Sequence, residues 1–462
     1  MLNDLISKYS SSFAKGQNTE LRLQQNLTRR AIFQNGMLVG NVRADEKGVS
    51  ARVYENGVYG FASAGELSDE AVRATLKNAS ENARFLDSKV KKGRGSLPEI
   101  LREDIGVQED MRDIEQKYYI DFAKEVDNYI ATKYPKLLSR GVYAVADSME
   151  KIILTSDGSR GHIIAPRSYV YIFLNALSSS GQPVELFEVP AGGRGTFDKN
   201  FTDPKLIFPK IDELYEKLMQ KAEGVHADAG LKTCILDGTL AGMLAHEAVG
   251  HTVEADLVLG GSVARNMLGK QVASPIVSMV DFAHTAFGET CQLPVYLDDE
   301  GVKAEDAVLI KDGILTGYMV NRDMGETLGM KPQGNARAWS FSDEPLIRMR
   351  NTAVLPGKNP LEEMIASIDD GYYFTNTNNG QADTTGEFMF GISMGYEIKK
   401  GKLGRAILDT TISGIAFEML KTVDMLGNEV KWSSSGFCGK KQPMPVSLGG
   451  PAVKCKVTIG GR

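Results

Sequence analysis

The sequence predicts an α+β fold, with an N-terminal mixed α/β domain followed by a C-terminal, mostly antiparallel β domain of barrel or sandwich type. Asn-Gly turns open the chain, three stretches with helical periodicity follow in its first half, and short strands between tight turns fill the second half. The 462 residues suffice for two or three domains. We expect two, over residues 1–225 and residues 226–462.

The first fifty or so residues are expected to form β-structure with tight turns. Turn-forming dipeptides occur at Asn35-Gly36 and Asn56-Gly57, and the second is flanked by β-prone residues on both sides. Ser68 then has the side chain of a helix N-cap. The helix predicted after it runs to about Phe85, and one of its faces is apolar: Val72, Leu76, Ala79 and Ala83.

Two more helices are predicted before the domain boundary, over residues 114–134 and 211–223. The first ends before Pro135, and the apolar face expected for it consists of Ile114, Tyr118, Phe122, Tyr129 and Ile130. Between the helices, a pair of strands is expected to turn at Asp157-Gly158. The glycine-rich segment 192–195 is expected to be a flexible loop, because it lacks the Lys-Ser/Thr pair of a phosphate-binding loop.

In the second half, short strands are separated by turn dipeptides. Strands are expected over residues 231–237, over residues 307–310 before Asp312-Gly313, and over residues 388–398 before Lys400-Gly401. Strands that follow one another through tight turns favour an antiparallel meander, which can curl into a barrel or pack as a sandwich.

Composition and charge exclude several classes of function. The net charge of −6 argues against broad nucleic-acid binding, which needs clustered basic side chains. Neither the N-terminus nor any later segment has an apolar run of signal-peptide or membrane-spanning length, so we expect a cytoplasmic protein without a membrane partner. The four cysteines are widely spaced and are expected to be free thiols, any of which can still bind a metal: Cys234, Cys291, Cys438 and Cys455.

The segment that indicates chemistry is His246-Glu247-Ala248-Val249-Gly250-His251, which contains two of the five histidines. The common zinc-peptidase motif, His-Glu-x-x-His, places its histidines four residues apart on one helical face. Here the separation is five residues, which directs the two side chains about 140° apart on a regular helix. The imidazoles therefore converge only if the helix widens into a π-turn or if His251 lies just past its end. Gly250 makes either distortion easier.

A catalytic zinc site needs a third protein ligand and an open position for water. Cys438 is the best distant candidate, since flanking glycines let its loop approach a metal, but spacing alone does not separate it from Glu254. Glu247 follows the first ligand directly and is the natural general base, which takes a proton from a zinc-bound water and passes it to the leaving amine. The remaining candidate ligands are Asp256, His162, His226, His284 and the other cysteines.

These residues resemble the TldD/PmbA family, whose members are also called modulators of DNA gyrase, and in particular its TldD-like, metal-binding members. The resemblance covers nearly the whole chain and is most specific in the second half. Besides the histidine segment with Glu254, it rests on Asp298-Asp299-Glu300-Gly301, Gly334-Asn335-Ala336-Arg337, Arg348-Met349-Arg350-Asn351-Thr352, Cys438-Gly439-Lys440 and Gly460-Gly461.

The resemblance implies a zinc peptidase in which His246, His251 and Cys438 bind Zn²⁺ and Glu247 is the catalytic carboxylate. It also implies short or unfolded peptides as substrates, and a dimer around an internal cavity, formed by two copies of the chain or with a PmbA/TldE-like paralogue. Direct nucleic-acid binding is not expected from an acidic chain. The alternatives are a non-catalytic, metal-stabilised partner or scaffold subunit of a peptidase complex, and a metal-dependent hydrolase of another amide or ester.

Overall fold

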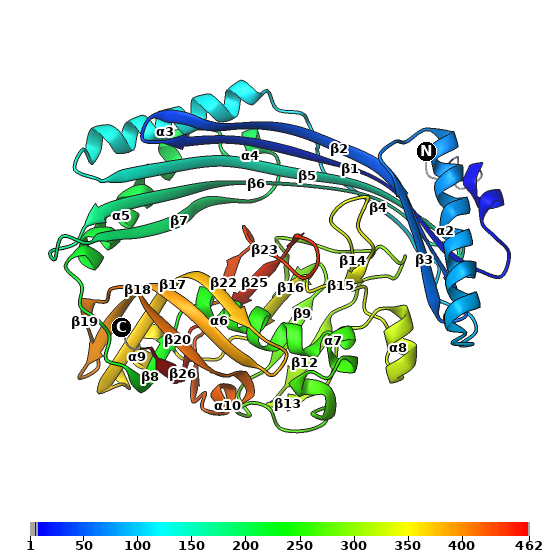
Figure 1. Ribbon diagram of the computed structural model, residues 1–462. Coiled ribbons are helices and arrows are strands. Elements are labelled where there is room, and N and C mark those ends of the chain that lie inside the picture. Colours follow the sequence, from blue (N-terminus) through cyan, green and yellow to red (C-terminus); the bar gives the residue numbers. More distant parts are fainter. Residues whose placement is uncertain (1–4, 6–7, 461–462) are drawn as a thin grey trace.

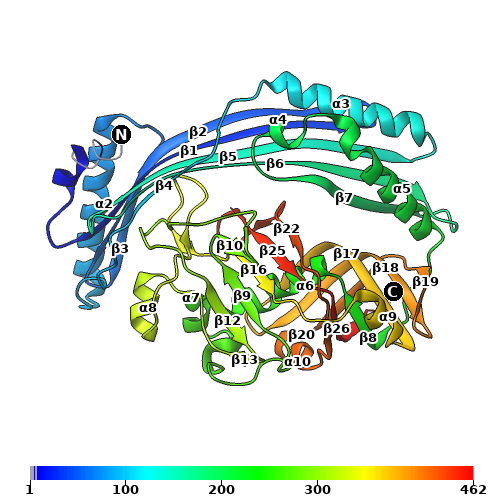
Figure 2. The ribbon, with the colours of Figure 1, turned by 180° about the vertical axis from the view of Figure 1, so that it is seen from behind.

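A long, curved sheet forms the N-terminal half of the computed structural model and arches over the C-terminal half (Figures 1 and 2). Its strand order is β3-β2-β1-β5-β6, and both β4 and β7 pair with β6. All pairings are antiparallel except that of β4 with β6. The strands are β1 (Asn18–Gln34), β2 (Met37–Glu55), β3 (Val58–Ala64), β4 (Asp104–Gln108), β5 (Ser139–Thr155), β6 (Arg160–Leu177) and β7 (Pro183–Arg194).

The structure describes residue 5 and residues 8–460. Most of the N-terminal stretch in which no signal-peptide run is expected, and Gly461 of the C-terminal motif, lie outside the described residues. Within them, the predicted turns are confirmed, because Asn35 and Asn56 have φ values of 51° and 48° and connect β1 to β2 and β2 to β3. Both residues of each turn have positive φ, as a type I′ turn requires.

The glycine-rich segment that we expected to be a flexible loop is instead largely the end of strand β7. Gly192 pairs with Tyr169 and Gly193 pairs with Ser168 of β6. A Cβ atom at Gly192 would lie 2.5 Å from the carbonyl oxygen of Ser168, so only glycine permits this close approach of the two strands. The prediction was wrong because glycines that allow close strand packing look the same in sequence as glycines that allow motion.

The three predicted helices are present as α2 (Asp69–Val90), α3 (Gln116–Lys133) and α5 (Phe208–Ala222). Ser68 caps α2 by accepting a hydrogen bond from the Ala71 amide, and the predicted apolar face of α2 is buried. The predicted face of α3 is confirmed at Phe122 and Ile130, which are buried, but not at Tyr118, which is 36% exposed while Tyr119 is buried. Both α3 and α5 cover the outer side of the arch (Figures 1 and 2). No helix among residues 8–460 is long and apolar enough to cross a membrane.

The C-terminal half contains a closed, mostly antiparallel barrel of five strands, which confirms the predicted α+β class. The strands close in the order β17-β8-β26-β20-β18, and β18 pairs back with β17. This order is not sequential, so the barrel is not the simple meander that the turns suggested. Its members are β8 (Gly230–Leu236), β17 (Asp370–Ala382), β18 (Glu387–Lys399), β20 (Thr410–Ile415) and β26 (Val453–Ile459).

A second sheet of six strands lies beside the barrel, in the order β13-β12-β9-β16-β25-β22. Both sheets contribute to one continuous apolar core. The division of the chain at residue 225 stays a prediction. The strands of this second sheet are β9 (Met279–Phe282), β12 (Ala307–Lys311), β13 (Ile314–Leu315), β16 (Asn351–Val354), β22 (Lys431–Ser433) and β25 (Ser447–Gly450).

Buried ion pairs hold the C-terminal half against the arched sheet. Asp299 accepts a hydrogen bond from Lys151 Nζ at 2.8 Å, and Glu300 accepts one from Arg52 Nη2 at 2.5 Å. Each of these four side chains is less than a tenth exposed. Because breaking a buried pair leaves an unpaired charge, these contacts fix how the two halves sit relative to one another.

Candidate metal centre

The histidine segment follows directly from barrel strand β8. After that strand, Asp237 caps the helix α6 (Gly238–Leu244) by accepting hydrogen bonds from the amides of Thr239 and Leu240. The helix then widens into a π-helix over Ala245–Gly250 and tightens into a 3₁₀ turn over His251–Val253. Of the two distortions that the five-residue spacing allowed, the structure has the π-turn.

The π-turn brings His246 and His251 onto one face. The His251 amide donates to the His246 carbonyl five residues earlier, which is the hydrogen bond that defines a π-turn. As a result, the centroids of the two imidazole rings lie 5.1 Å apart, and the ring planes form an angle of 80°. A regular α-helix would have pointed them to different sides.

Gly250 makes room for this turn through packing rather than through an unusual backbone conformation. Its φ of −53° is helical. A Cβ atom there would lie 2.1 Å from the sulfur of Met349, which is buried against the π-turn. The glycine is therefore required by the neighbouring core.

We expect Gly250→Ala to lower the free energy of unfolding by about 1–3 kcal/mol, because the added methyl group overpacks the contact with Met349. Chemical denaturation of the parent and the variant measures the difference. Gly106→Ala is the matched control, since no atom lies within 4 Å of a Cβ placed at that position in β4. Equal stability of Gly250→Ala and Gly106→Ala would contradict the packing argument.

Cys438 completes the cluster from a hairpin far along the chain. It lies in β23 (Phe437–Cys438), which pairs with β24 (Met444–Pro445). Its Sγ is 3.3 Å from His251 Nε2. One potential ligand atom from each of His246, His251 and Cys438 lies within 4.8 Å of the others, and no other such group of His, Cys, Asp or Glu occurs among residues 8–460.

Glu254, the alternative third ligand, lies behind His251. Its Oε2 is 2.8 Å from His251 Nδ1, the ring nitrogen opposite the one facing Cys438. Lys440 Nζ lies 3.1 Å from the same carboxylate oxygen and 2.7 Å from Asp256. Sequence reasoning missed this role of Lys440, although its position two residues after Cys438 was a possible signal. The lysine thereby connects the β23–β24 hairpin, which contains Cys438, to the segment that follows His251.

The cluster has the electrostatics of a cation site. Burial opposes protonation of His251, but the Glu254 carboxylate and Cys438 outweigh burial and raise the pKa of His251 to about 10. Burial likewise opposes ionisation of Cys438, but the two histidines outweigh it and lower the pKa of this thiol to about 4. Both ring nitrogens of His246 are buried without a hydrogen-bond partner. A buried imidazole without a partner is uncommon and fits a side chain that binds a ligand.

Glu247 lies beside the cluster and faces a large cleft. Its carboxylate oxygens are 3.9 Å from His246 Nε2 and 3.8 Å from His251 Nε2. The cleft has a volume of about 890 Å³ and is bounded by the arched sheet, α5 and the C-terminal half. His246 and Glu247 form part of its wall, together with aromatic side chains that include Tyr169, Tyr171, Tyr373 and Trp432.

Two other histidines considered as ligands lie in separate environments. His162 bonds to Glu150 and Gln108 between strands of the arched sheet. His284 stacks on Tyr296, with ring centroids 4.8 Å apart. The structure therefore brings together His246, His251, Cys438 and Glu247, and leaves His162 and His284 outside the cluster.

A His-His-Cys cluster beside a glutamate, with His246 and Glu247 in the wall of a cleft, is the kind of residue set that metallopeptidases use. Comparison with known proteins identifies the family. A profile described as the PmbA/TldA metallopeptidase C-terminal domain matches residues 230–461, and one for domain 1 of the same metallopeptidases matches residues 19–83. The chain belongs to the PmbA/TldD metallopeptidase family.

Individual relatives agree with this assignment. A metalloprotease of Methanothermobacter thermautotrophicus is 30% identical over 454 residues, which cover 96% of this chain and 95% of the relative. A zinc metalloprotease TldD homologue of Saccharolobus solfataricus is 28% identical over 90% of both chains. The crystal structure of TldE from Thermococcus kodakarensis superposes with a TM-score of 0.76 over the full length of both chains, at 17% identity, and so shares the fold.

Proposed function

We propose that this protein is a zinc-dependent peptidase that hydrolyses short or unfolded peptides. The observation that carries the proposal is the convergence of His246, His251 and Cys438 beside Glu247, at a point where His246 and Glu247 line the cleft. The homologue from Saccharolobus solfataricus, which is named a zinc metalloprotease, supports the choice of metal.

The residues fit a zinc ion. Two imidazoles and one thiolate are a donor set that suits zinc, and three protein ligands leave the open position that catalysis needs. Donor atoms on a tetrahedral zinc lie about 3.3–3.6 Å apart, given bond lengths of about 2.0–2.3 Å. The 3.3 Å between Cys438 Sγ and His251 Nε2 is close to this spacing, and a donor atom of His246 lies within 4.8 Å of both.

Glu254 and Lys440 stabilise the proposed ligand His251 on the side of its ring away from Cys438. The hydrogen bond between Glu254 and His251 Nδ1 directs Nε2 toward the ion position and holds the ring in place. Lys440 neutralises the carboxylate charge that would otherwise be buried without a cation, since Glu254 is fully buried.

Glu247 is the proposed general base. A bound zinc supplies Lewis acidity, which polarises the scissile carbonyl and makes water acidic enough to deprotonate near neutral pH. The Glu247 carboxylate accepts that proton and then donates it to the leaving amine. Its side chain is 23% exposed, so it can contact both water and a substrate in the cleft.

The shape of the cleft supports peptides as the substrates. A volume of about 890 Å³ lies within the range of sites for small molecules and short peptides and is far too small for a folded domain. Aromatic side chains from both halves of the molecule line it and offer apolar contacts to peptide side chains. We further propose that the working form is a dimer, with a second copy or a PmbA/TldE-like paralogue, in line with the fold shared with TldE.

The proposal is tested by incubating the zinc-loaded protein with a reduced, alkylated polypeptide and analysing the products by mass spectrometry. We expect cleavage that a chelator abolishes and that added zinc restores. A metal-stabilised scaffold would instead lose thermal stability on chelation without ever cutting a peptide. That result, or cleavage that persists without metal, would contradict the proposed function.

A further inference from the structure

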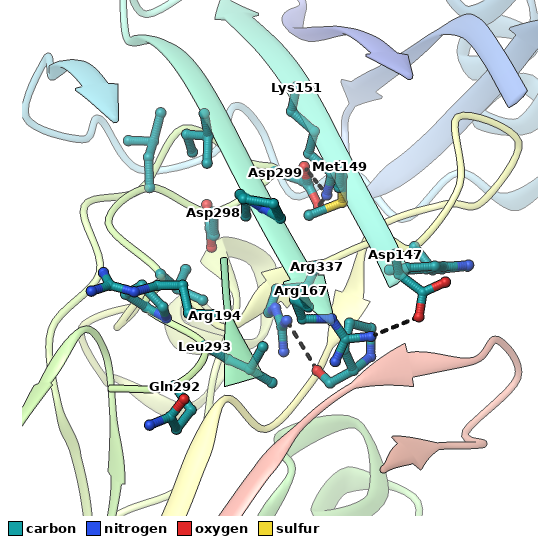
Figure 3. Close-up of a pocket in the computed structure, with 18 residues that line it drawn as sticks. Asp147, Met149, Lys151, Arg167, Arg194, Gln292, Leu293, Asp298, Asp299 and Arg337 are labelled. Carbon is teal, nitrogen blue, oxygen red and sulfur yellow. Dashed lines mark hydrogen bonds and ion pairs between the residues drawn. The ribbon is translucent and has the colours of Figure 1, made fainter. Parts of the chain in front are cut away.

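A second cavity lies between the arched sheet and the C-terminal half, separate from the metal centre (Figure 3). It has a volume of about 70 Å³ and shares no lining residue with the large cleft. Because a water molecule needs about 10–15 Å³ measured in this way, the cavity can hold a ligand of a few non-hydrogen atoms. Its polar lining is rich in charge: Lys151, Arg167, Arg194, Arg337, Asp147, Asp298 and Asp299.

The two adjacent carboxylates in this cavity already have partners. Asp298 accepts hydrogen bonds from the backbone amides of Glu300, Val302 and Ala336 at 2.9–3.0 Å. Asp299 accepts from Lys151 Nζ and from the Ala338 amide. A cavity whose acidic groups are occupied in this way does not need a cation.

Arg337, in contrast, is a buried cation that makes no direct ion pair with a carboxylate in the described part of the chain. It is 8% exposed, and its guanidinium donates only to the carbonyl oxygens of Met349, at 2.6 Å, and Pro445, at 3.2 Å. Burial and the neighbouring Arg348 lower the pKa of Arg337 to about 10, although the charges of Asp281 and Asp299 act in the opposite direction. These carboxylates therefore compensate the buried charge only in part, and an anion in direct contact with the guanidinium would stabilise it further.

Arg167 adds a second guanidinium, which pairs with Asp147 and lies over the rings of Tyr169 and Phe437. Its contacts to Asp147 and to the Ser434 carbonyl are both 3.4 Å long. Arg167 and Arg337 both line the cavity, and both are labelled in Figure 3. Each guanidinium carries the forked set of donors that matches a carboxylate.

Apart from Gln292 and these charged residues, the wall is mostly apolar. Ile163 and Pro166 of β6 face the cavity from the sheet, and Leu293, Val295 and Leu297 face it from the C-terminal half. A ligand that satisfies both parts of the wall has one anionic group and a short apolar body.

We propose that this cavity binds a small carboxylate with a short aliphatic body, its charged group held by Arg337 and Arg167. The ligand is either a free carboxylic acid or the C-terminal carboxylate of a peptide, since both present the same chemistry. The metal centre does not use the segment Gly334-Asn335-Ala336-Arg337. Binding of a carboxylate gives a reason for the buried arginine at its end. This binding does not depend on the proposed peptidase activity, because no zinc ligand lines the cavity.

Isobutyrate and isobutyramide are the matched probes, because they have the same shape and differ in charge. Ligand-observed NMR on the full chain without added metal measures their binding. We expect a dissociation constant for isobutyrate on the order of 1 mM and at least about tenfold weaker binding of the amide. Absence of isobutyrate binding at 20 mM, or equal binding of both probes, would overturn the proposal.

Two variants locate the binding. Arg337→Gln removes the charge and is expected to weaken isobutyrate binding at least tenfold, whereas Arg84→Gln, at an exposed position of α2, leaves it unchanged. If Arg337→Gln does not fold, Ala165→Leu fills the cavity from its wall without touching a charged group, and must also abolish binding. Unchanged binding in a folded form of either cavity variant would show that isobutyrate binds elsewhere.

Competition identifies the source of the carboxylate. A pentapeptide ending in valine and the same peptide with a C-terminal amide are each added to the isobutyrate complex. Displacement by the acid but not by the amide supports a peptide terminus as the ligand, and displacement by neither supports a free carboxylic acid. Displacement by the amide as well would overturn the assignment of the charged group to Arg337 and Arg167.

Discussion

The Glu247→Gln variant is expected to bind zinc as tightly as the parent protein and to cleave peptides about 10²–10⁴-fold more slowly. The amide keeps the size of the side chain at the cleft wall but cannot accept a proton from water. Because the proposed ligands are His246, His251 and Cys438, the metal should stay in place. Steady-state cleavage of a quenched fluorescent peptide and zinc content measured on the same sample test the two parts of this prediction.

A matched control separates the chemistry from a general loss of charge. Glu418→Gln makes the same substitution at an exposed position of α10 (Ala416–Lys421), where the carboxylate only pairs with Lys421, and should cleave at the parental rate. If Glu247→Gln keeps the parental rate, then Glu247 is not the general base. If it loses zinc, the carboxylate acts in metal binding rather than in proton transfer.

The Cys438→Ser variant is expected to bind zinc more than about 100-fold more weakly than the parent and to lose measurable cleavage. A serine hydroxyl stays protonated and is a poor ligand, whereas the thiolate is among the donors that zinc prefers. Loss of residues that merely support ligands already weakens metal binding about 10–100-fold, so loss of a ligand should exceed that range. Competition with a chromophoric chelator measures the zinc affinity.

Two further variants make this second test specific. Cys291→Ser alters another buried thiol outside the cluster and should keep the parental zinc affinity. Glu254→Gln should weaken zinc binding by about 10–100-fold only, because Glu254 orients His251 and does not face the ion position. If Glu254→Gln loses zinc completely while Cys438→Ser retains it, the third ligand is Glu254 and the proposed site is wrong.

Much of the N-terminal half could be predicted because its signals are local. The turns at Asn35-Gly36 and Asn56-Gly57 need only the residues at which φ becomes positive. The N-cap at Ser68 and the apolar face of α2 likewise depend on neighbours within one or two helical turns. Where the prediction failed, at Tyr118 and at the glycines of β7, the deciding contact was with another element.

The candidate site also combines features that local sequence predicted with features that depend on contacts between distant elements. The five-residue spacing between His246 and His251 limited the local backbone to two conformations, and the π-turn is one of them. The packing of Met349 against Gly250, which accompanies that turn, has no signal in the sequence. The contacts of Lys440 with Glu254 and Asp256 likewise depend on how distant segments meet, and the sequence offered only the proximity of Lys440 to Cys438 as a signal.

By itself, the sequence determined the helices, the hairpins, the α+β class and the identity of the residues able to bind a metal. Only the tertiary structure decided which of those residues converge. Cys438 lies 187 residues from His251 and yet 3.3 Å from it, whereas Glu254, three residues away, contacts the opposite ring nitrogen. The physical reason is that propensity and spacing act over a few residues. The segments that meet at the cluster, the one after β8 and the β23–β24 hairpin, are far apart in the chain, and their separation in sequence contains no distance information.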